Sequence, residues 1–147
     1  MFKHILVPTD GSELSQQAIT HAVAFAKETG ARITAFYAKP DYQLGHVGDG
    51  LLNDLLSPEK FDEKADRHAH ECLEDAHQAC EAANVACNMV AIASNTPYKA
   101  IIDTAEREGC DLIFMASHGR SGLSGLLIGS ETNKVLSHSK IPVLVYR

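Results

Sequence analysis

Short apolar segments alternate with helix-like segments along the whole chain, and this alternation is the feature that most restricts its fold. The run DLIFMA at residues 111–116 is apolar nearly throughout, whereas a strand with one solvated face would alternate apolar and polar residues. Similar runs occupy residues 4–7, 31–38, 85–92 and 141–146. Strands that are separated by helices are joined by right-handed crossovers, which produces a parallel sheet covered on both faces.

The length of 147 residues and the hydrophobic content of 45% are typical of one domain with a sizeable core. We therefore expect a single α/β domain over residues 1–147. Its sheet is predicted to be open, five-stranded and mostly parallel, with the Rossmann-like strand order 3-2-1-4-5 and helices on both faces. Residues 39–58 contain three glycines and two prolines, so they are predicted to form a variable loop.

Capping residues mark the ends of the expected helices. Ser12, Ser57 and Thr96 each stand where an N-cap belongs, and a proline follows two of them directly. Gly30 and Gly109 stand where a helix would end in a left-handed residue. These signals predict three long helices, and a fourth, shorter helix is expected over residues 130–138.

Charge and hydropathy limit the classes of partner. The formal net charge is −6 and no basic cluster occurs, which argues against binding to the nucleic-acid backbone. No apolar run approaches the ~20 residues that span a bilayer, so no membrane partner is expected. The first residues lack the apolar segment of a signal peptide, and we expect a cytoplasmic protein. In that reducing compartment Cys72, Cys80, Cys87 and Cys110, which form no C-x-x-C pair, are predicted to be small buried hydrophobic residues.

Two unusual loops follow the first and fourth predicted strands. One is residues 8–12 (PTDGS), and the other is the glycine-rich stretch at residues 117–131. Ligands of open parallel sheets bind beyond the carboxyl ends of the strands, where the strand order reverses. In the order 3-2-1-4-5 the first and fourth strands are neighbours, so Asp10 should face the glycine-rich loop.

The loop chemistry suits a nucleotide. Glycines let backbone N–H groups approach phosphate oxygens, and a helix that starts near Ser130 offers free N–H groups and the positive end of its dipole. Ser117 and Thr132 could add hydroxyl donors and Arg120 a cation, while Asp10 could bind a ribose hydroxyl or a divalent metal. The alternative is a loop without ligand, in which Ser130 is an ordinary N-cap and Asp10 only forms a turn.

Two further groups of polar residues have an ordinary structural explanation. His118 could act as a general base, but local packing or hydrogen bonding is the favoured interpretation. His70, Glu74 and His77 share one helix face and could bind zinc, but a solvated polar face is favoured. We therefore predict no catalytic residue and no metal site built by the chain itself.

The chain resembles the universal stress proteins along essentially its whole length. The resemblance rests on ILVPTDGSE at residues 5–13, DLIFMASHGRSG at residues 111–122 and IPVLVYR at residues 141–147. In the ATP-binding branch of this family the glycine loop reads G-x-x-G, nine residues, then G-[ST]. Gly119, nine intervening residues and the pair at 129–130 fit the second part, while Ala116 replaces the first glycine.

This resemblance implies an adenine nucleotide alpha hydrolase-like fold and a binding site for an adenine nucleotide. Carried over by position, the contact residues are Pro8, Thr9, Asp10, Tyr37, Met115, Ala116, His118, Gly119, Arg120, Gly129, Ser130 and Glu131. The first three would line the adenosine end, and the backbone of the tyrosine would meet adenine. The residues from 115 to 120 would follow the ribose and phosphates, and the last three would complete the phosphate cradle.

The expected function is that of a stress-response regulator that binds ATP or AMP, with or without Mg²⁺, and is not an enzyme. The alternatives are a nucleotide-free interaction protein, for which Ala116 would mark loss of the ligand, and a slow ATPase. The resemblance also implies a homodimer. The last strand, from Ile141 to Tyr146, is apolar and is predicted at the edge of the sheet, where it could pair with the same strand of a second copy.

Overall fold

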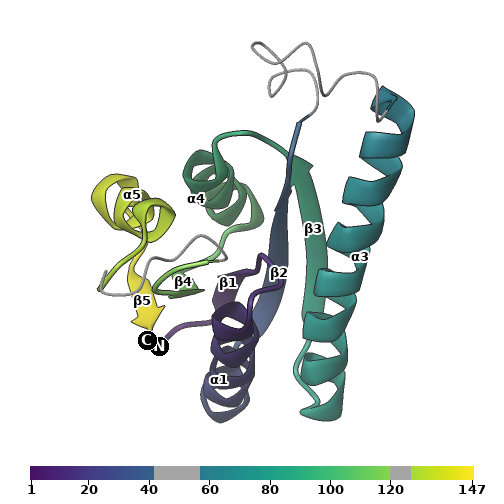
Figure 1. Ribbon diagram of the computed structural model, residues 1–147. Helices are drawn as coiled ribbons and strands as arrows, with labels where there is room; N and C mark the ends of the chain where they lie inside the picture. Colours follow the sequence, from purple (N-terminus) through teal and green to yellow (C-terminus); the bar gives the residue numbers. More distant parts are fainter. Residues whose placement is uncertain (42–56, 120–126) are drawn as a thin grey trace.

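The computed structural model describes residues 1–41, 57–119 and 127–147 (Figure 1). In this part of the chain five strands form one sheet in the order β3-β2-β1-β4-β5, which confirms the predicted order. Every neighbouring pair is parallel, so the sheet is all-parallel rather than mostly parallel. The strands are β1 His4–Pro8, β2 Arg32–Lys39, β3 Cys87–Ala93, β4 Leu112–Ala116 and β5 Val143–Tyr146. The helices are α1 Glu13–Thr29, α3 Pro58–Ala82, α4 Pro97–Glu108 and α5 Ser130–His138.

Most of the predicted caps are present. The Ser12 hydroxyl accepts a bond from Ser15 N at 3.2 Å, and Ser57 accepts one from Lys60 N at 3.3 Å. Gly30 and Gly109 end their helices with φ of 69° each, the left-handed conformation that favours glycine. Thr96 differs, because it stands at the N-cap of α4 without a side-chain cap bond.

β2 and β4 begin one residue later than predicted, and β3 and β5 begin two residues later because local hydrogen bonds occupy the residues before them. β3 begins at Cys87 instead of residue 85, since Val85 N donates to Cys80 O at 2.9 Å and so lies in the turn that follows α3. β5 begins at Val143 instead of residue 141, since Ile141 N donates to Ser139 Oγ at 3.0 Å. Of the predicted loop at residues 39–58, both ends belong to β2 and α3, and residues 42–56 lie outside the described part of the chain.

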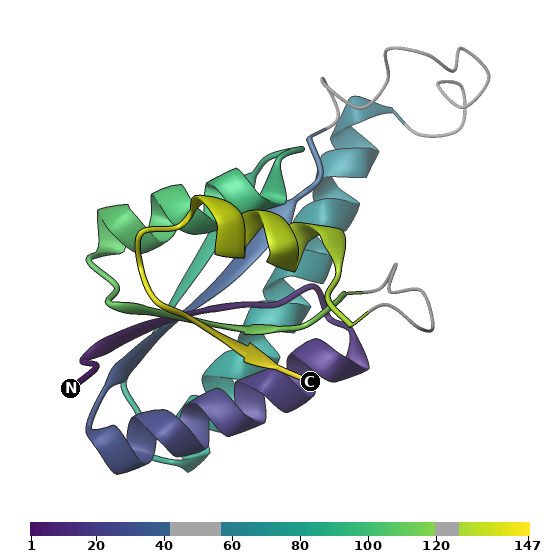
Figure 2. The same cartoon turned by 90° about the vertical axis from the view of Figure 1, so that its left-hand side faces the viewer.

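The helices cover the two faces of the sheet in pairs. α1 and α3 pack on one face, while α4 and α5 lie together over the other, as the turned view shows (Figure 2). Along β1, Ile5 and Val7 join the core under α1 and α3, whereas Leu6 joins the core under α4 and α5. The central strands β1 and β4 are apolar nearly throughout because both of their faces are buried, whereas the edge strand β3 leaves several residues exposed, Asn88 among them. Within the described residues, no helix combines the length and the apolar character needed to cross a membrane.

His4, at the start of β1, is a buried titratable group. It is 4% exposed, and its Nε2 lies 2.7 Å from Thr34 Oγ1. Burial lowers the pKa of His4 below its usual 6.5, and the Arg32 charge lowers it further, although Asp111 acts in the opposite direction. The folded protein therefore holds His4 neutral at a pH where the unfolded chain already binds a proton.

This difference predicts that stability falls as the pH drops below about 6.5, because the unfolded state then takes up a proton that the folded state does not. One such group contributes a slope of at most about 1.4 kcal/mol per pH unit. Urea unfolding between pH 7.5 and pH 5 measures the slope. A His4→Gln variant should flatten it, and an unchanged slope in that variant would contradict the assignment.

Candidate functional site

A cavity of about 500 Å³ opens beyond the carboxyl ends of β1 and β4, at the point where the strand order reverses. β1 and β4 are neighbours, with Ile5 beside Leu112, so the loops that follow them start at the same edge of the sheet. Eleven of the twelve residues that the resemblance implies line this cavity. The twelfth, Arg120, lies outside the described residues. Contact of these residues with a ligand stays a prediction.

Six lining residues were not among those twelve: Ser15, Phe36, Ala38, Pro97, Ile101 and Thr132. Pro97 and Ile101 belong to α4, which only tertiary packing brings over the cavity. The position of Phe36 could have been inferred from β2, because successive side chains of a strand point to opposite faces of the sheet. Phe36 faces the α4 side, so its neighbour Tyr37 must face α3, where the Tyr37 ring meets His68 edge-on at 5.6 Å. The Tyr37 side chain is thus turned toward α3 although the residue also lines the cavity, and contact of its backbone with adenine stays a prediction from the resemblance.

The loop after β1 is held by its own polar side chains. Thr9 N donates to Phe36 O at 2.9 Å, and the Thr9 hydroxyl lies 3.1 Å from Ser15 Oγ. Ser12 N donates to Asp10 Oδ1 at 2.9 Å, which is an Asx turn, and Gly11 takes a φ of 78°. Asp10 therefore stabilises a turn, as the alternative interpretation expected, and it also lines the cavity.

Gly119 and Gly129, the glycines of the second loop that the structure describes, allow close approach of protein to protein. A Cβ added at Gly119 would overlap the Asp10 carboxylate, and one at Gly129 would lie 3.0 Å from His118 Cβ and 3.2 Å from Ser117 O. Gly129 N also donates to Ser117 O at 2.7 Å. Neither glycine has a positive φ. These glycines are thus required because the two loops pack tightly around the cavity.

Ala116 is the position where the family motif carries glycine. It is the last residue of β4, and its carbonyl accepts a bond from the Thr132 hydroxyl at 2.9 Å. Among the described residues other than glycine, only Asn84 has a positive φ, so the backbone at Ala116 takes a conformation that alanine adopts without strain. The Ala116 methyl group therefore adds no backbone strain to the folded protein.

The N-terminus of α5 forms one side of the cavity. Gly129 is its N-cap and Ser130 its first helical residue, so the alternative in which Ser130 caps the helix is wrong. The N–H groups of this first turn have no partner within the helix and carry the positive end of its dipole. Two of the expected hydroxyl donors are engaged within the protein. Thr132 bonds Ala116 O, and Ser117 is fully buried with its Oγ 3.1 Å from His118 Nδ1.

Glu131 ties α5 to α4. Its Oε2 accepts a bond from Tyr98 N at 2.9 Å, and its Oε1 accepts one from Lys134 Nζ at 2.9 Å, which raises the pKa of Lys134. Glu131 thereby supplies the N-terminal cap that Thr96 does not provide for α4. A part of Glu131 in a phosphate cradle stays a prediction from the resemblance.

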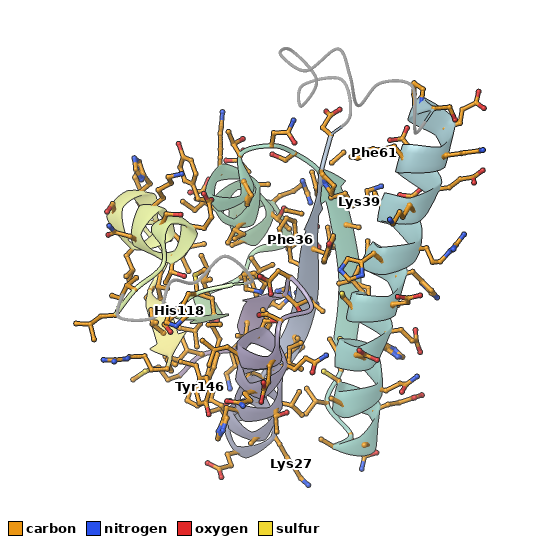
Figure 3. The ribbon with its side chains drawn as sticks, in the orientation of Figure 1. Lys27, Phe36, Lys39, Phe61, His118 and Tyr146 are labelled. Carbon is orange, nitrogen blue, oxygen red and sulfur yellow. The ribbon has the colours of Figure 1, made fainter. Side chains whose placement is uncertain are left out.

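The remaining candidates do not form a second site. His118 lies within hydrogen-bond distance of Ser117, in agreement with the local role favoured for it. Figure 3 labels His118 and Phe36. His70 is exposed on α3, and Glu74 accepts a bond from Gln78 Nε2 at 3.4 Å. In the parts of the chain that the structure describes, no group of three histidine, cysteine or acidic side chains is arranged to hold a metal ion.

Comparison with known proteins identifies the family. The model of the universal stress protein family matches residues 1–147. Universal stress protein MJ0531 of Methanocaldococcus jannaschii is 31% identical, over all of this chain and 83% of its own length. Universal stress protein YxiE of Bacillus subtilis is 30% identical over the full length of both chains.

Solved structures share the fold. The structure of MJ0577, also from M. jannaschii, superposes with a TM-score of 0.83 at 28% identity, over 99% of this chain and 95% of its own. A universal stress protein in complex with cAMP gives a TM-score of 0.71 at 23% identity, over 99% and 97% of the two chains. One from Archaeoglobus fulgidus in complex with dAMP gives 0.72 at 13% identity, over 100% and 98%. The chain belongs to the universal stress protein family.

Proposed function

We propose that the cavity beyond β1 and β4 binds an adenine nucleotide, ATP or AMP, and that the protein is a stress-response regulator whose conformation or partner depends on occupancy. The observation that carries the proposal is the cavity itself. Its volume of about 500 Å³ lies within the ~300–1,000 Å³ of small-molecule sites. Phe36, Ile101 and Met115 offer an apolar wall for a base, and the first turn of α5 offers N–H groups for phosphate.

The ligands of related proteins support an adenine nucleotide. Two universal stress proteins of this fold were crystallised with cAMP and with dAMP. The unstrained backbone at Ala116 supports retention of the site despite the missing motif glycine.

The charges around the cavity suggest how phosphates would be held. The charged side chains among the described lining residues are those of Asp10 and Glu131, both acidic. Anion binding would therefore rest on backbone N–H groups, and a divalent ion could bridge the Asp10 carboxylate and the phosphates. We accordingly expect Mg²⁺ to strengthen binding of ATP more than binding of AMP.

Titration calorimetry with ATP, AMP and cAMP, each with and without Mg²⁺, tests the proposal. We expect saturable binding of at least one adenine nucleotide and no binding of UTP. A ligand at about one hundred times its Kd stabilises the fold by about 2.7 kcal/mol, so the melting temperature should rise as well. Absence of both heat and a melting shift with every adenine nucleotide would exclude the proposal and favour a nucleotide-free interaction protein.

We propose a regulatory rather than a catalytic role. The Ser117 contact of His118 favours a local structural role for this imidazole over that of a general base. A slow ATPase remains the competing function of the same cavity. Phosphate release by the wild type that clearly exceeds release by an Asp10→Ala variant would favour the ATPase.

We further propose a cytoplasmic homodimer that pairs through β5. This strand lies at one end of the sheet, and its residues Val143–Tyr146 are half-buried and apolar. An edge strand presents N–H and C=O groups that a second copy can pair around a two-fold axis. Sedimentation that shows only monomer at micromolar concentration would refute the dimer without bearing on nucleotide binding.

A further inference from the structure

Two cysteines meet where α3 ends and β3 begins. Cys80 lies in the last turn of α3 and is fully buried, whereas Cys87 is the first residue of β3 and is half-buried. The connection between them is held by its backbone. Val85 N donates to Cys80 O at 2.9 Å, and Asn84 takes the left-handed φ of 57°. The chain is thereby turned back on itself between the two cysteines.

The side chains of the two cysteines point into the same layer. Cys87 lies beside Ile33 in the register of β2 and β3, and Ile33 belongs to the core between the sheet and α3. Cys80 is on the buried face of α3 and belongs to the same core, against which Cys87 packs. Each thiol shifts the pKa of the other, so the two side chains lie close together, while the Cys87 Sγ donates to Asn88 O at 3.5 Å.

The environment makes the two thiols unequal. The interaction between the two thiols raises the pKa of Cys80 and lowers the pKa of Cys87. Burial acts against the lowering at Cys87, while a backbone hydrogen bond from Ala35 and the charge of His77 support it. The thiolate is the form of cysteine that reacts with peroxides. β3 is an edge strand, so a small oxidant can reach the half-buried Cys87.

We propose that Cys87 and Cys80 are a redox modification site, in which Cys87 reacts with hydrogen peroxide and Cys80 resolves the product into an intramolecular disulfide. The Cys87 thiolate attacks one peroxide oxygen, the O–O bond breaks, and a sulfenic acid forms with release of hydroxide. The Cys80 sulfur then attacks the Cys87 sulfur, the S–O bond breaks, and the second oxygen leaves as water with the Cys80 proton. Two thiols are oxidised by two electrons, and one peroxide is reduced to two water molecules.

The other two cysteines are poorly placed for this reaction. Cys110 is buried, and desolvation raises its pKa to about 11, so it stays a thiol. Cys72 is buried, with its Sγ 3.7 Å from His68 Nε2. The disulfide would join the end of α3 to the edge strand β3. Neither Cys80 nor Cys87 lines the nucleotide cavity, so the modification does not depend on the proposed function.

Peroxide treatment of the reduced, purified protein followed by mass spectrometry tests the proposal. We expect the intact mass to fall by two hydrogen atoms and the thiols open to alkylation after denaturation to fall from four to two. Dithiothreitol should restore all four. Cleavage after Glu81 separates the two cysteines into different peptides, and these should stay joined until reduction.

Two alanine variants on the same helix provide the control, because both replace a buried cysteine of α3. Cys72→Ala should still lose two hydrogen atoms, whereas Cys80→Ala should not. In Cys80→Ala the interaction that lowers the pKa of Cys87 is gone, so Cys87 should react more slowly and stop at a sulfenic acid that dimedone traps. The peptide map of the wild type needs neither variant to fold. Four free thiols after oxidation, or a disulfide that includes Cys72 or Cys110, would overturn the proposal.

Discussion

Replacing Gly119 with alanine is expected to weaken binding of the adenine nucleotide about tenfold or more, a loss of about 1.4 kcal/mol in binding free energy. The new Cβ would overlap the Asp10 carboxylate, which must then leave its place beside the cavity. Because Asp10 Oδ1 also accepts a bond from Ser12 N, the displacement would disturb the turn that follows β1. Titration calorimetry of wild type and variant with the same nucleotide measures the loss.

Gly30→Ala is the matched control for this experiment. Gly30 ends α1 with φ of 69°, and no atom lies within 4 Å of the position where a Cβ would stand. Alanine there strains the backbone and should cost about 1 kcal/mol of stability, but it should leave nucleotide affinity unchanged. If Gly119→Ala bound nucleotide as tightly as Gly30→Ala, the contact between Gly119 and Asp10 would have no part in the site.

Replacing Phe36 with alanine is expected to lower the free energy of unfolding by about 3–5 kcal/mol, as for other buried aromatic residues. Phe36 is 1% exposed and packs in the core under α4, where truncation leaves a void that well-packed neighbours fill only in part. A loss of this size is a large share of the ~5–15 kcal/mol that stabilises a typical domain. Urea unfolding followed by circular dichroism measures it.

Phe36→Ala also removes part of the apolar wall of the cavity, because Phe36 is one of its lining residues. Phe36→Leu keeps most of the buried apolar volume and should recover much of the lost stability. Met89→Ala, on β3, removes a side chain that is 42% exposed and should change stability by no more than about 0.5 kcal/mol. A loss for Phe36→Ala as small as that for Met89→Ala would show that Phe36 does not support the core.

The topology was predictable from the sequence because each of its determinants is local. Apolar runs of strand length, helix caps at Ser12 and Ser57, and terminal glycines at Gly30 and Gly109 all act within a few residues. Short right-handed crossovers then leave few possible strand orders. The position of the cavity followed as well, since ligands of such sheets bind where the strand order reverses.

The late starts of β3 and β5 reflect local hydrogen bonds, whereas the errors at the helix N-termini involve contacts between segments. The N-cap of α5 is Gly129 and not Ser130, because the Gly129 carbonyl accepts the first helical bond, from Asn133 N, while its N–H group is bonded to Ser117 O across the glycine-rich loop. Thr96 does not cap α4, because the Glu131 carboxylate of α5 takes that place. No pattern around residue 96 could have indicated this contact.

The sequence by itself therefore determined the α/β architecture, because hydrophobic periodicity and capping are encoded residue by residue. The strand order and the edge of the sheet where a ligand would bind followed from that architecture. Only the tertiary structure decided what Gly119 and Gly129 contact, which wall α4 adds to the cavity, and that Cys80 and Cys87 share one core. Each of these depends on contact between segments that fold separately and meet only when the helices pack onto the sheet.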